Sequence, residues 1–260
     1  MSFKLKSRLA SGAPVVGTFI FSSDPASTEI AALAGCDFVI VDREHTGLSW
    51  GDIQNHCRAA EARGISLLVR TRSPSGEEVA KALDVGAEGA VIPHFGLDRD
   101  ASLACVRSAR FHPQGDRGTC TGTRPGSFGL GDFSRAVAEA NRDALVVVQI
   151  EDAEVLPHLD ELFSEARIDA VMPGLADLST SLGKPGQFAD PEVIEAAGKV
   201  FSAAERANLP LGLYIANAGE TARWASRKAN FYVYAIDYKV LAEGYRTAVS
   251  AIRQGLAHAC

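Results

Sequence analysis

Apolar residues in this chain gather in eight short runs that are rich in β-branched side chains. Each run is apolar at consecutive rather than alternate positions, which is typical of strands buried on both faces in a parallel sheet. The runs begin near residues 16, 37, 66, 89, 145, 169, 211 and 231. Most starts lie 20 to 30 residues apart, with longer gaps after the fourth and sixth runs, which leaves room for a helix after each strand.

Helical patterns follow the apolar runs. The clearest occupies residues 23–35, where Asp24 can cap a helix, Pro25 suits its first position and Gly35 can end it. In this segment Ile30 and Leu33 fall on one face. Further helices are expected to begin near Ser49, Ser73, Asp98, Asp190, Asn217 and Asp237.

Eight strand–helix units in 260 residues predict an α/β fold, a (β/α)8 barrel, better than an open doubly wound sheet. We expect a single domain that spans residues 1–260. Hydrophobic residues make up 47% and charged residues 22% of the chain, which is the composition of a compact globular protein.

The overall charge favours small molecules as partners. A net charge of −6 without a basic block speaks against binding to nucleic acid or to an anionic membrane. No apolar run approaches the roughly 18 residues of a membrane-spanning helix. The first residues also lack a signal-peptide core, so a cytoplasmic location is predicted. The cysteines lack C-x-x-C spacing and are expected to be reduced structural thiols: Cys36, Cys57, Cys105, Cys120 and Cys260.

Polar side chains follow the predicted strands, at the end of the barrel where such folds build active sites. Among them, Glu151 and Asp177 lie 26 residues apart, about one repeat, so adjacent strands could bring them face to face. Paired carboxylates suit Mg²⁺ or Mn²⁺ with open positions for water and substrate. The open alternative is that both are solvated or pair with arginines.

The stretch VIVDREHTG, residues 39–47, ends a buried strand in four ionisable side chains. His45 could transfer protons if a carboxylate orients its ring, or could be an ordinary loop residue. Arg70, after the next strand, could clamp a carboxylate or an enolate oxygen, or could form an internal ion pair with Asp42 or Glu44. Arg43 and Glu44 have no assigned chemistry and are expected only to pair locally.

Two loops carry further expectations. The long glycine-rich segment 112–133 interrupts the repeat and is expected to cover the substrate rather than to act as a plain linker. The segment PGLADLSTSLG, residues 173–183, turns into a helix, and its backbone N–H groups could hold a substrate carboxylate beside Asp177.

Seven motifs share their order and spacing with one known family: DFVIVDREH, LLVR, KALDVGAEGAVIPH, FHPQGDRG, VVVQIEDAEVL, GLADLSTSLG and DPEV. Together they closely resemble the class II pyruvate aldolases of the HpcH/HpaI family over nearly the whole chain. The resemblance implies a metal-dependent (β/α)8 barrel that cleaves or forms carbon–carbon bonds in 4-hydroxy-2-oxoacids through a pyruvate enolate. It implies Mg²⁺, Mn²⁺ or Co²⁺ as the cofactor, and a 2-oxoacid and an aldehyde as partners.

The resemblance also implies roles for single residues. Glu151 and Asp177 match metal ligands, and Arg70 matches the arginine at the keto or enolate oxygen. His45 matches an acid/base histidine. The remaining matches are two acids that support this histidine, a polar residue near the ketoacid and a turn that binds its carboxylate: Asp42 and Asp84, Gln149, and Gly174, Ala176 and Asp177. The Asp84 equivalent reaches in from a neighbouring subunit, and family members form trimers or hexamers that exchange the last helix, here the segment after Asp237.

This chain departs from the family pattern at three places. Leu175 replaces a proline in the carboxylate-binding turn, and Ala235 replaces a glycine near the end of strand eight. His94 stands where better-known aldolases often carry methionine, which adds a polar group at the mouth and leaves the aldehyde preference open.

Three rival functions use the same barrel. The same enolate forms when oxaloacetate loses CO₂, so the enzyme could be a decarboxylase or could resemble macrophomate synthase. A Schiff-base aldolase would need a lysine at a strand end, and only Lys239 is near one. An inactive ketoacid-binding barrel is disfavoured because His45, Arg70, Glu151 and Asp177 are all present.

Overall fold

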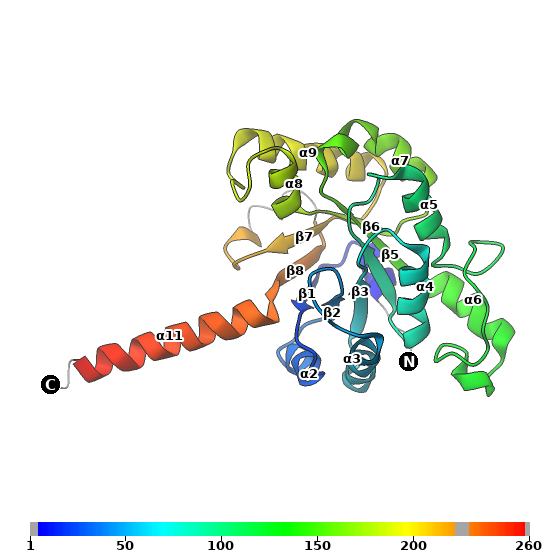
Figure 1. Ribbon diagram of the computed structural model, residues 1–260, viewed down its shortest axis with the longest axis horizontal. Helices are drawn as coiled ribbons and strands as arrows, with labels where there is room; N and C mark the ends of the chain where they lie inside the picture. The colour runs from blue at the N-terminus through cyan, green and yellow to red at the C-terminus, as the bar shows by residue number, and fades with distance from the viewer. Residues whose placement is uncertain (1–4, 222–228, 258–260) are drawn as a thin grey trace.

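The computed structural model of the protein describes residues 5–221 and 229–257. Eight parallel strands form one sheet in the order β6-β5-β4-β3-β2-β1-β8-β7. A parallel bridge between Val171 and Leu211 joins the two edge strands, so the sheet is a nearly closed barrel surrounded by helices (Figure 1). The strands are β1 (Val15–Ile20), β2 (Phe38–Asp42), β3 (Ser66–Arg70), β4 (Gly89–Ile92), β5 (Leu145–Ile150), β6 (Ala170–Pro173), β7 (Gly212–Ile215) and β8 (Phe231–Ile236).

The predicted (β/α)8 barrel is confirmed, and every strand begins within one residue of its predicted start. The helix expected from Asn217 runs into residues outside the described ranges. The α-helices are α1 (Leu5–Ala10), α2 (Ala26–Leu33), α3 (Trp50–Arg63), α4 (Gly76–Val85), α5 (Arg99–Arg107), α6 (Phe133–Asp143), α7 (Leu159–Glu165), α8 (Leu175–Ser181), α9 (Pro191–Arg206) and α11 (Asp237–Ala257). Two 3₁₀ helices are η1 (Ser127–Gly129) and η2 (Ala153–His158).

The helix boundaries follow from local chemistry. Ser49 and Asp52 form a reciprocal capping box at the start of α3, and Gly64 ends that helix in the left-handed conformation. In α2 the cap lies one residue later than predicted: Pro25 is the N-cap, while the Asp24 carboxylate accepts a hydrogen bond from the Ala26 amide.

The barrel interior is filled by apolar side chains from β1 to β6 and β8. Phe38 and Phe231 stack there with ring centroids 4.5 Å apart. A Cβ atom at Gly17 would lie 2.5 Å from the Phe38 ring, so glycine is required at this close approach. Leu5 and Leu9 of α1 join the same cluster and close the amino end of the barrel, which we call the floor. Two further apolar clusters lie between strands and helices.

The floor also contains a buried ionic network. The Asp169 carboxylate accepts a hydrogen bond from Arg110 at 2.8 Å and lies 3.0 Å from the Lys6 ammonium. It also accepts from the backbone amide of Val146. Arg110 also donates to the carbonyls of Arg167 and Ala144. These buried charges therefore have partners on the same chain.

The glycine-rich segment 112–133 was expected to cover the substrate. It lies beside the floor instead and does not cover the mouth of its own barrel. Arg117 of this segment forms an ion pair with Asp84 at 2.7 Å, at the end of α4. Arg124 pairs with Glu61 near the end of α3. Helices in this fold run back toward the amino ends of the strands, so these contacts fix the segment there.

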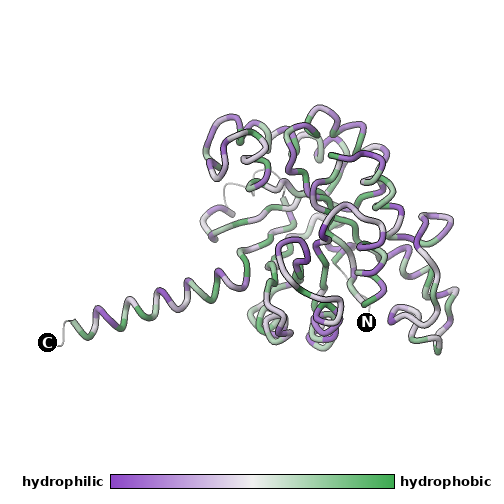
Figure 2. Tube along the Cα trace, viewed as in Figure 1, coloured by the Kyte–Doolittle hydropathy of each residue, from purple (hydrophilic) through white to green (hydrophobic). Residues whose placement is uncertain are grey.

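Helix α11 projects away from the barrel (Figure 1). Its first turn contacts the barrel, where Tyr238 donates to the carbonyl of Phe21. Apolar and polar residues alternate along the projecting remainder (Figure 2). Among the described residues, its exposed large apolar side chains are Tyr238, Val240, Leu241, Tyr245, Val249, Ile252 and Leu256. On α2 the face predicted to be apolar is also exposed, with Ile30 at 65% and Leu33 at 71%.

Two predictions about the chain as a whole can be compared with the structure. Within residues 5–221 and 229–257, no helix combines the length and the hydrophobicity that crossing a bilayer requires. The described cysteines are free thiols, as expected, and Cys260 lies outside the described residues.

Candidate active site at the barrel mouth

The carboxyl ends of the strands place charged side chains around one opening, which we call the mouth. Asp42 ends β2 and lies in register with Arg70, which ends β3. His94 and Glu151 follow β4 and β5, and Asp177 lies in the first turn of α8 after β6. The fold therefore brings these side chains to one end of the barrel, as predicted.

Arg70 is held on three sides. Its Nε donates to Asp42 Oδ1 at 2.5 Å, and a terminal nitrogen lies 3.3 Å from Glu44 Oε2. The guanidinium also lies over the Phe19 ring, 4.7 Å from its centroid. The internal ion pair considered from the sequence is thus present, and it presents the remaining donors of a rigid cation to the mouth.

Asp42 organises the backbone of the DREH segment. Its carboxylate accepts from the amide of His45 at 2.8 Å and from the amide of Glu44 at 3.4 Å. The acid within ion-pair reach of the His45 ring is Glu44, at 3.6 Å from Nε2. In this chain Asp42 therefore orients the segment and Arg70, while the His45 ring, 54% exposed, faces Glu44.

Glu151 is almost fully buried at the mouth, with 1% of its side chain exposed. It accepts from the backbone amide of His94 and from Gln149 Nε2, both at 2.7 Å. A Cβ atom at position 174 would lie 2.1 Å from Glu151 Oε2, so only Gly174 leaves room for this carboxylate. Burial raises the pKa of Glu151 to about 7; the charges of Glu44 and Asp177 also raise it, against the opposing effect of His94.

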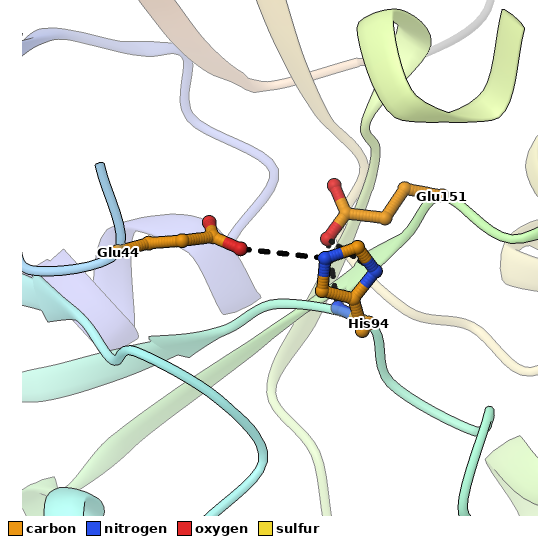
Figure 3. Close-up of side chains that lie close together, drawn as sticks. All are labelled: Glu44, His94 and Glu151. Atoms are coloured by element: carbon orange, nitrogen blue, oxygen red, sulfur yellow. Dashed lines mark hydrogen bonds and ion pairs between the residues drawn. The ribbon is translucent and has the colours of Figure 1, made fainter. Parts of the chain in front are cut away.

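Two residues of the mouth were given no role in the sequence analysis. Glu44 points at the His94 ring, with Oε1 at 3.4 Å from Nε2, and Glu151 lies on the other side of the same ring (Figure 3). Burial raises the pKa of Glu44, although Arg70 and both histidines oppose this. Burial lowers the pKa of His94, but the carboxylates of Glu151, Asp152 and Glu44 raise it on balance.

The signal for these two residues was present in the sequence. Glu44 lies within the same turn as His45, and His94 directly follows the VIP end of β4. The ion pair of Glu44 with Arg70 was one of the alternatives open from the sequence, and it is present. The contact of Glu44 with His94 goes beyond the local pairing that was expected. Arg43 does pair away from the mouth, with Glu78 at 3.6 Å and over the Trp50 ring.

The turn into α8 borders Glu151. Gly174 is the N-cap of this helix, and Ala176 and the half-buried Asp177 lie in its first turn. The first N–H groups of a helix have no partner within it, so they can bind an anion. Gln149 is buried beside Glu151, and its Oε1 has no hydrogen-bond partner among the described residues.

Asp84 does not reach this mouth. It lies at the far end of α4, where its carboxylate pairs with Arg117. A role at the mouth would have to be played toward another copy of the chain, as the family resemblance implies.

The donor set of the mouth suits a divalent cation. Five carboxylates, with few positive side chains to balance them, meet there: Asp42, Glu44, Glu151, Asp152 and Asp177. Glu44, His94 and Glu151 each offer one donor atom, and these atoms lie within 4.8 Å of one another. Oxygen-rich donors with one imidazole are ordinary ligands of Mg²⁺, Mn²⁺ and related ions.

The fold and this mouth define a (β/α)8 enzyme with a carboxylate-lined site. The profile of the HpcH/HpaI aldolase/citrate lyase family matches residues 16–243, and the chain belongs to this family. The protein is accordingly a carbon–carbon lyase of the aldolase type, as the sequence predicted.

Three comparisons illustrate the relationship. The chain is 28% identical over 256 residues to a hydroxypyruvate/pyruvate aldolase of Paraburkholderia phytofirmans, which covers 96% of this chain and 97% of that protein. It is 27% identical to a 5-keto-4-deoxy-D-glucarate aldolase of Escherichia coli K12, with 91% of each chain covered. Its structure resembles that of an HpcH/HpaI aldolase from Desulfitobacterium hafniense DCB-2, with a TM-score of 0.90, 31% identity and 97% of each chain covered.

Proposed function

We propose that the protein cleaves or forms 4-hydroxy-2-oxoacids as a divalent-metal-dependent pyruvate aldolase. The observation that carries this proposal is Glu151, a carboxylate buried beneath Gly174, with Asp177 near enough for its charge to raise the pKa of Glu151. A second carboxylate beside a buried one is unfavourable without a cation. The pyruvate and ketoglucarate aldolases among its relatives support the same reaction class.

Glu151 and Asp177 would hold the metal, with Mg²⁺, Mn²⁺ or Co²⁺ as candidates. When bound, a divalent ion supplies Lewis-acid stabilisation of the negative charge that develops on a keto oxygen. Gln149, fixed against Glu151, would keep the buried carboxylate in one orientation.

The chain's own residues would carry the rest of the reaction. The amides around Gly174, Ala176 and Asp177 would bind the substrate carboxylate, and Arg70 would donate to the keto oxygen. His45 would take the proton of the C4 hydroxyl as the C3–C4 bond breaks. The products of this step are an aldehyde and the enolate of pyruvate, and protonation of the enolate carbon gives pyruvate.

Arg70 is well suited to its part because Asp42 and Glu44 fix it before substrate arrives. A preorganised cation needs no reorganisation when the enolate charge develops, which is the main source of electrostatic catalysis. Asp42 would therefore act through Arg70 and through the DREH backbone.

We also propose a cytoplasmic homo-oligomer, a trimer or hexamer, in which α11 packs on another subunit. The projecting helix and the exposed apolar faces of α11 and α2 support this assembly. In it, Asp84 of one subunit would support His45 of the next. The expected result in sedimentation is a species of three or six chains, and Leu241→Asp with Ile252→Asp should yield monomers.

The function is tested by incubating the protein with pyruvate and a panel of aldehydes, beside oxaloacetate alone. We expect aldol products that are lost with a chelator and restored by Mg²⁺, Mn²⁺ or Co²⁺. Oxaloacetate decarboxylation without any aldol product would favour the decarboxylase, which uses the same enolate. Trapping of pyruvate by borohydride would instead indicate a Schiff base and would contradict the proposal.

A further inference from the structure

We propose that His94 supplies a nitrogen ligand to the divalent metal, so that the site prefers Mn²⁺ or Co²⁺ to Mg²⁺. This inference rests on the proposed function only in requiring a metal at Glu151. The inference goes beyond the proposed function because it gives His94 a role as a third protein ligand. It also says which metals the site should prefer.

The spacing of the donor atoms matches ligands of one ion. His94 Nε2 lies 3.4 Å from Glu44 Oε1, and one donor atom each of Glu44, His94 and Glu151 lie within 4.8 Å of one another. Charge-assisted hydrogen bonds between nitrogen and carboxylate are shorter, about 2.7–2.9 Å. Two ligands that each stand about 2.0–2.2 Å from a metal are roughly 3.0–3.5 Å apart. The observed separation of 3.4 Å is therefore long for a hydrogen bond and ordinary for two ligands that share an ion.

The tautomer of His94 leaves the correct nitrogen free. Its Nδ1 lies 3.1 Å from Asp152 Oδ2, and an ionised carboxylate can only accept, so the proton belongs on Nδ1. In the neutral ring, which is the form that binds a metal, the lone pair on Nε2 then faces Glu44. A carboxylate that accepts from one ring nitrogen while the other binds a metal is the usual outer shell of a metal-ligating histidine.

Backbone contacts and conformation also fix the position of His94. Its amide donates to Glu151 Oε1 at 2.7 Å, so one residue would contact the metal-binding carboxylate through its backbone and face it with its ring. The residue has φ of 48°, in the left-handed region that few non-glycine residues occupy. An independent feature points to a ligand here: Gln149, 5% exposed, has an unpartnered Oε1 in the described structure and contacts the same carboxylate.

An imidazole ligand changes metal selectivity. Mg²⁺ takes oxygen donors and keeps its waters, whereas imidazole favours later first-row metals in the order Mn²⁺ to Co²⁺ and beyond. A mouth with Glu151, Asp177 and Glu44 alone would suit Mg²⁺ equally well. With His94 as a ligand, the site should bind Mn²⁺ and Co²⁺ more tightly than Mg²⁺.

The test uses the full chain loaded with Mn²⁺ and pulsed electron paramagnetic resonance, which detects ¹⁴N bonded to the ion. We expect imidazole modulation in the wild type, its loss in His94→Asn and its retention in His45→Asn. Asparagine tolerates positive φ, which keeps the backbone of position 94 comparable. His45→Asn is the matched control because it removes the other histidine of the mouth, which also contacts Glu44.

Calorimetric titration gives a second readout. His94→Asn should weaken Mn²⁺ and Co²⁺ binding by about tenfold or more and leave Mg²⁺ binding within about threefold. Asp152→Ala, which leaves the ring in place but removes its orienting acceptor, should weaken Mn²⁺ binding by about 10–100-fold.

The outcomes separate this inference from the proposed function. Mn²⁺ bound to the wild type without ¹⁴N modulation, or modulation that disappears in His45→Asn instead, would overturn the role of His94 and leave the metal-dependent aldolase intact. A wild type that binds none of the three metals would contradict the proposed function itself. If His94→Asn does not fold, the wild-type and His45→Asn spectra decide the question.

Discussion

The floor and the mouth of this barrel both bury charged side chains, but they balance them differently. At the floor, Asp169 accepts from Arg110, Lys6 and a backbone amide, so its charge has partners on the same chain. At the mouth, Glu151 is more deeply buried and has further carboxylates nearby. It accepts hydrogen bonds, but no arginine or lysine of residues 5–221 and 229–257 pairs with it. The charge of Asp169 at the floor is thus balanced within the chain, whereas the carboxylates around Glu151 at the mouth would be balanced by a bound cation.

This difference indicates that the ionised mouth lowers the free energy of unfolding when no metal is bound. A buried acid whose pKa is raised to about 7 disfavours the folded state when ionised, and such sites are characteristic of function. The comparison predicts that changes at the mouth alter activity more than stability, and that changes at the floor do the reverse.

The largest effect is expected from Glu151→Gln. Removal of a metal ligand should lower aldol turnover by at least about 10³-fold and abolish metal binding. The same change should raise the melting temperature of the metal-free protein near pH 8, because it removes a buried charge that lacks a cation. Turnover assays and thermal melts check both expectations, with the exposed Glu154→Gln as the control that changes neither. A destabilised variant would contradict the contrast between mouth and floor.

The next effect concerns His45→Ala. Loss of the acid/base group should reduce aldol turnover by about 10²–10⁴-fold while fold and metal affinity are preserved. The exposed His158→Ala, on η2, is the matched control. Steady-state kinetics and a metal titration measure the two effects, and unchanged turnover would make DREH a structural turn that needs no proton-transfer side chain.

At the floor, Arg110→Met should reverse the pattern. It leaves the partly buried Asp169 with one charged partner fewer, which should cost about 2 kcal/mol of unfolding free energy. Turnover per folded molecule should stay near wild type, because Arg110 lies at the opposite end of the strands. Denaturant unfolding measures the loss, and Arg142→Gln, which removes an exposed pair with Asp143, should show none. Loss of activity in folded Arg110→Met would show that the two ends are coupled.

The smallest effect is a pH dependence from Glu88, which precedes β4 at the floor. Burial raises the pKa of Glu88 to about 7, above its ordinary value near 4.5. The folded state therefore binds more protons between these values, so stability declines as pH rises through this window. Glu88→Gln should flatten that part of the curve and raise stability at pH 8, by on the order of 2 kcal/mol. Unfolding experiments at pH 5 and pH 8 measure it, and an unchanged slope would assign the pH dependence to other groups.

The sequence predicted the barrel well because its signal is local. Consecutive apolar residues define strands covered on both faces, and the carboxyl ends of such strands share one end of the barrel. The metal-binding role of Glu151 and Asp177 followed from this rule and from the family resemblance, and it remains a prediction. The donor cluster of the structure contains Glu151, with Glu44 and His94, but not Asp177.

Two features could not be predicted from the sequence: the end of the barrel at which segment 112–133 lies, and the residues that the Glu44 side chain contacts. Segment 112–133 looked like a substrate cover because it is long and rich in glycine, but it connects α5 to α6, and its contact with Asp84 at the end of α4 holds it at the floor. Glu44 looked like a residue that pairs only locally. Its contacts with Arg70 and His94 depend on side-chain directions at three different strand ends, which spacing does not specify.

The central claim is that the mouth stabilises a pyruvate enolate with a metal at Glu151. Exchange of the methyl protons of pyruvate with D₂O, followed by NMR, measures enolate formation without any aldehyde. The account predicts exchange in the presence of Mn²⁺, none after chelation and none in Glu151→Gln. Pyruvate binding without metal-dependent exchange would contradict it and would indicate a barrel that binds ketoacids without catalysis.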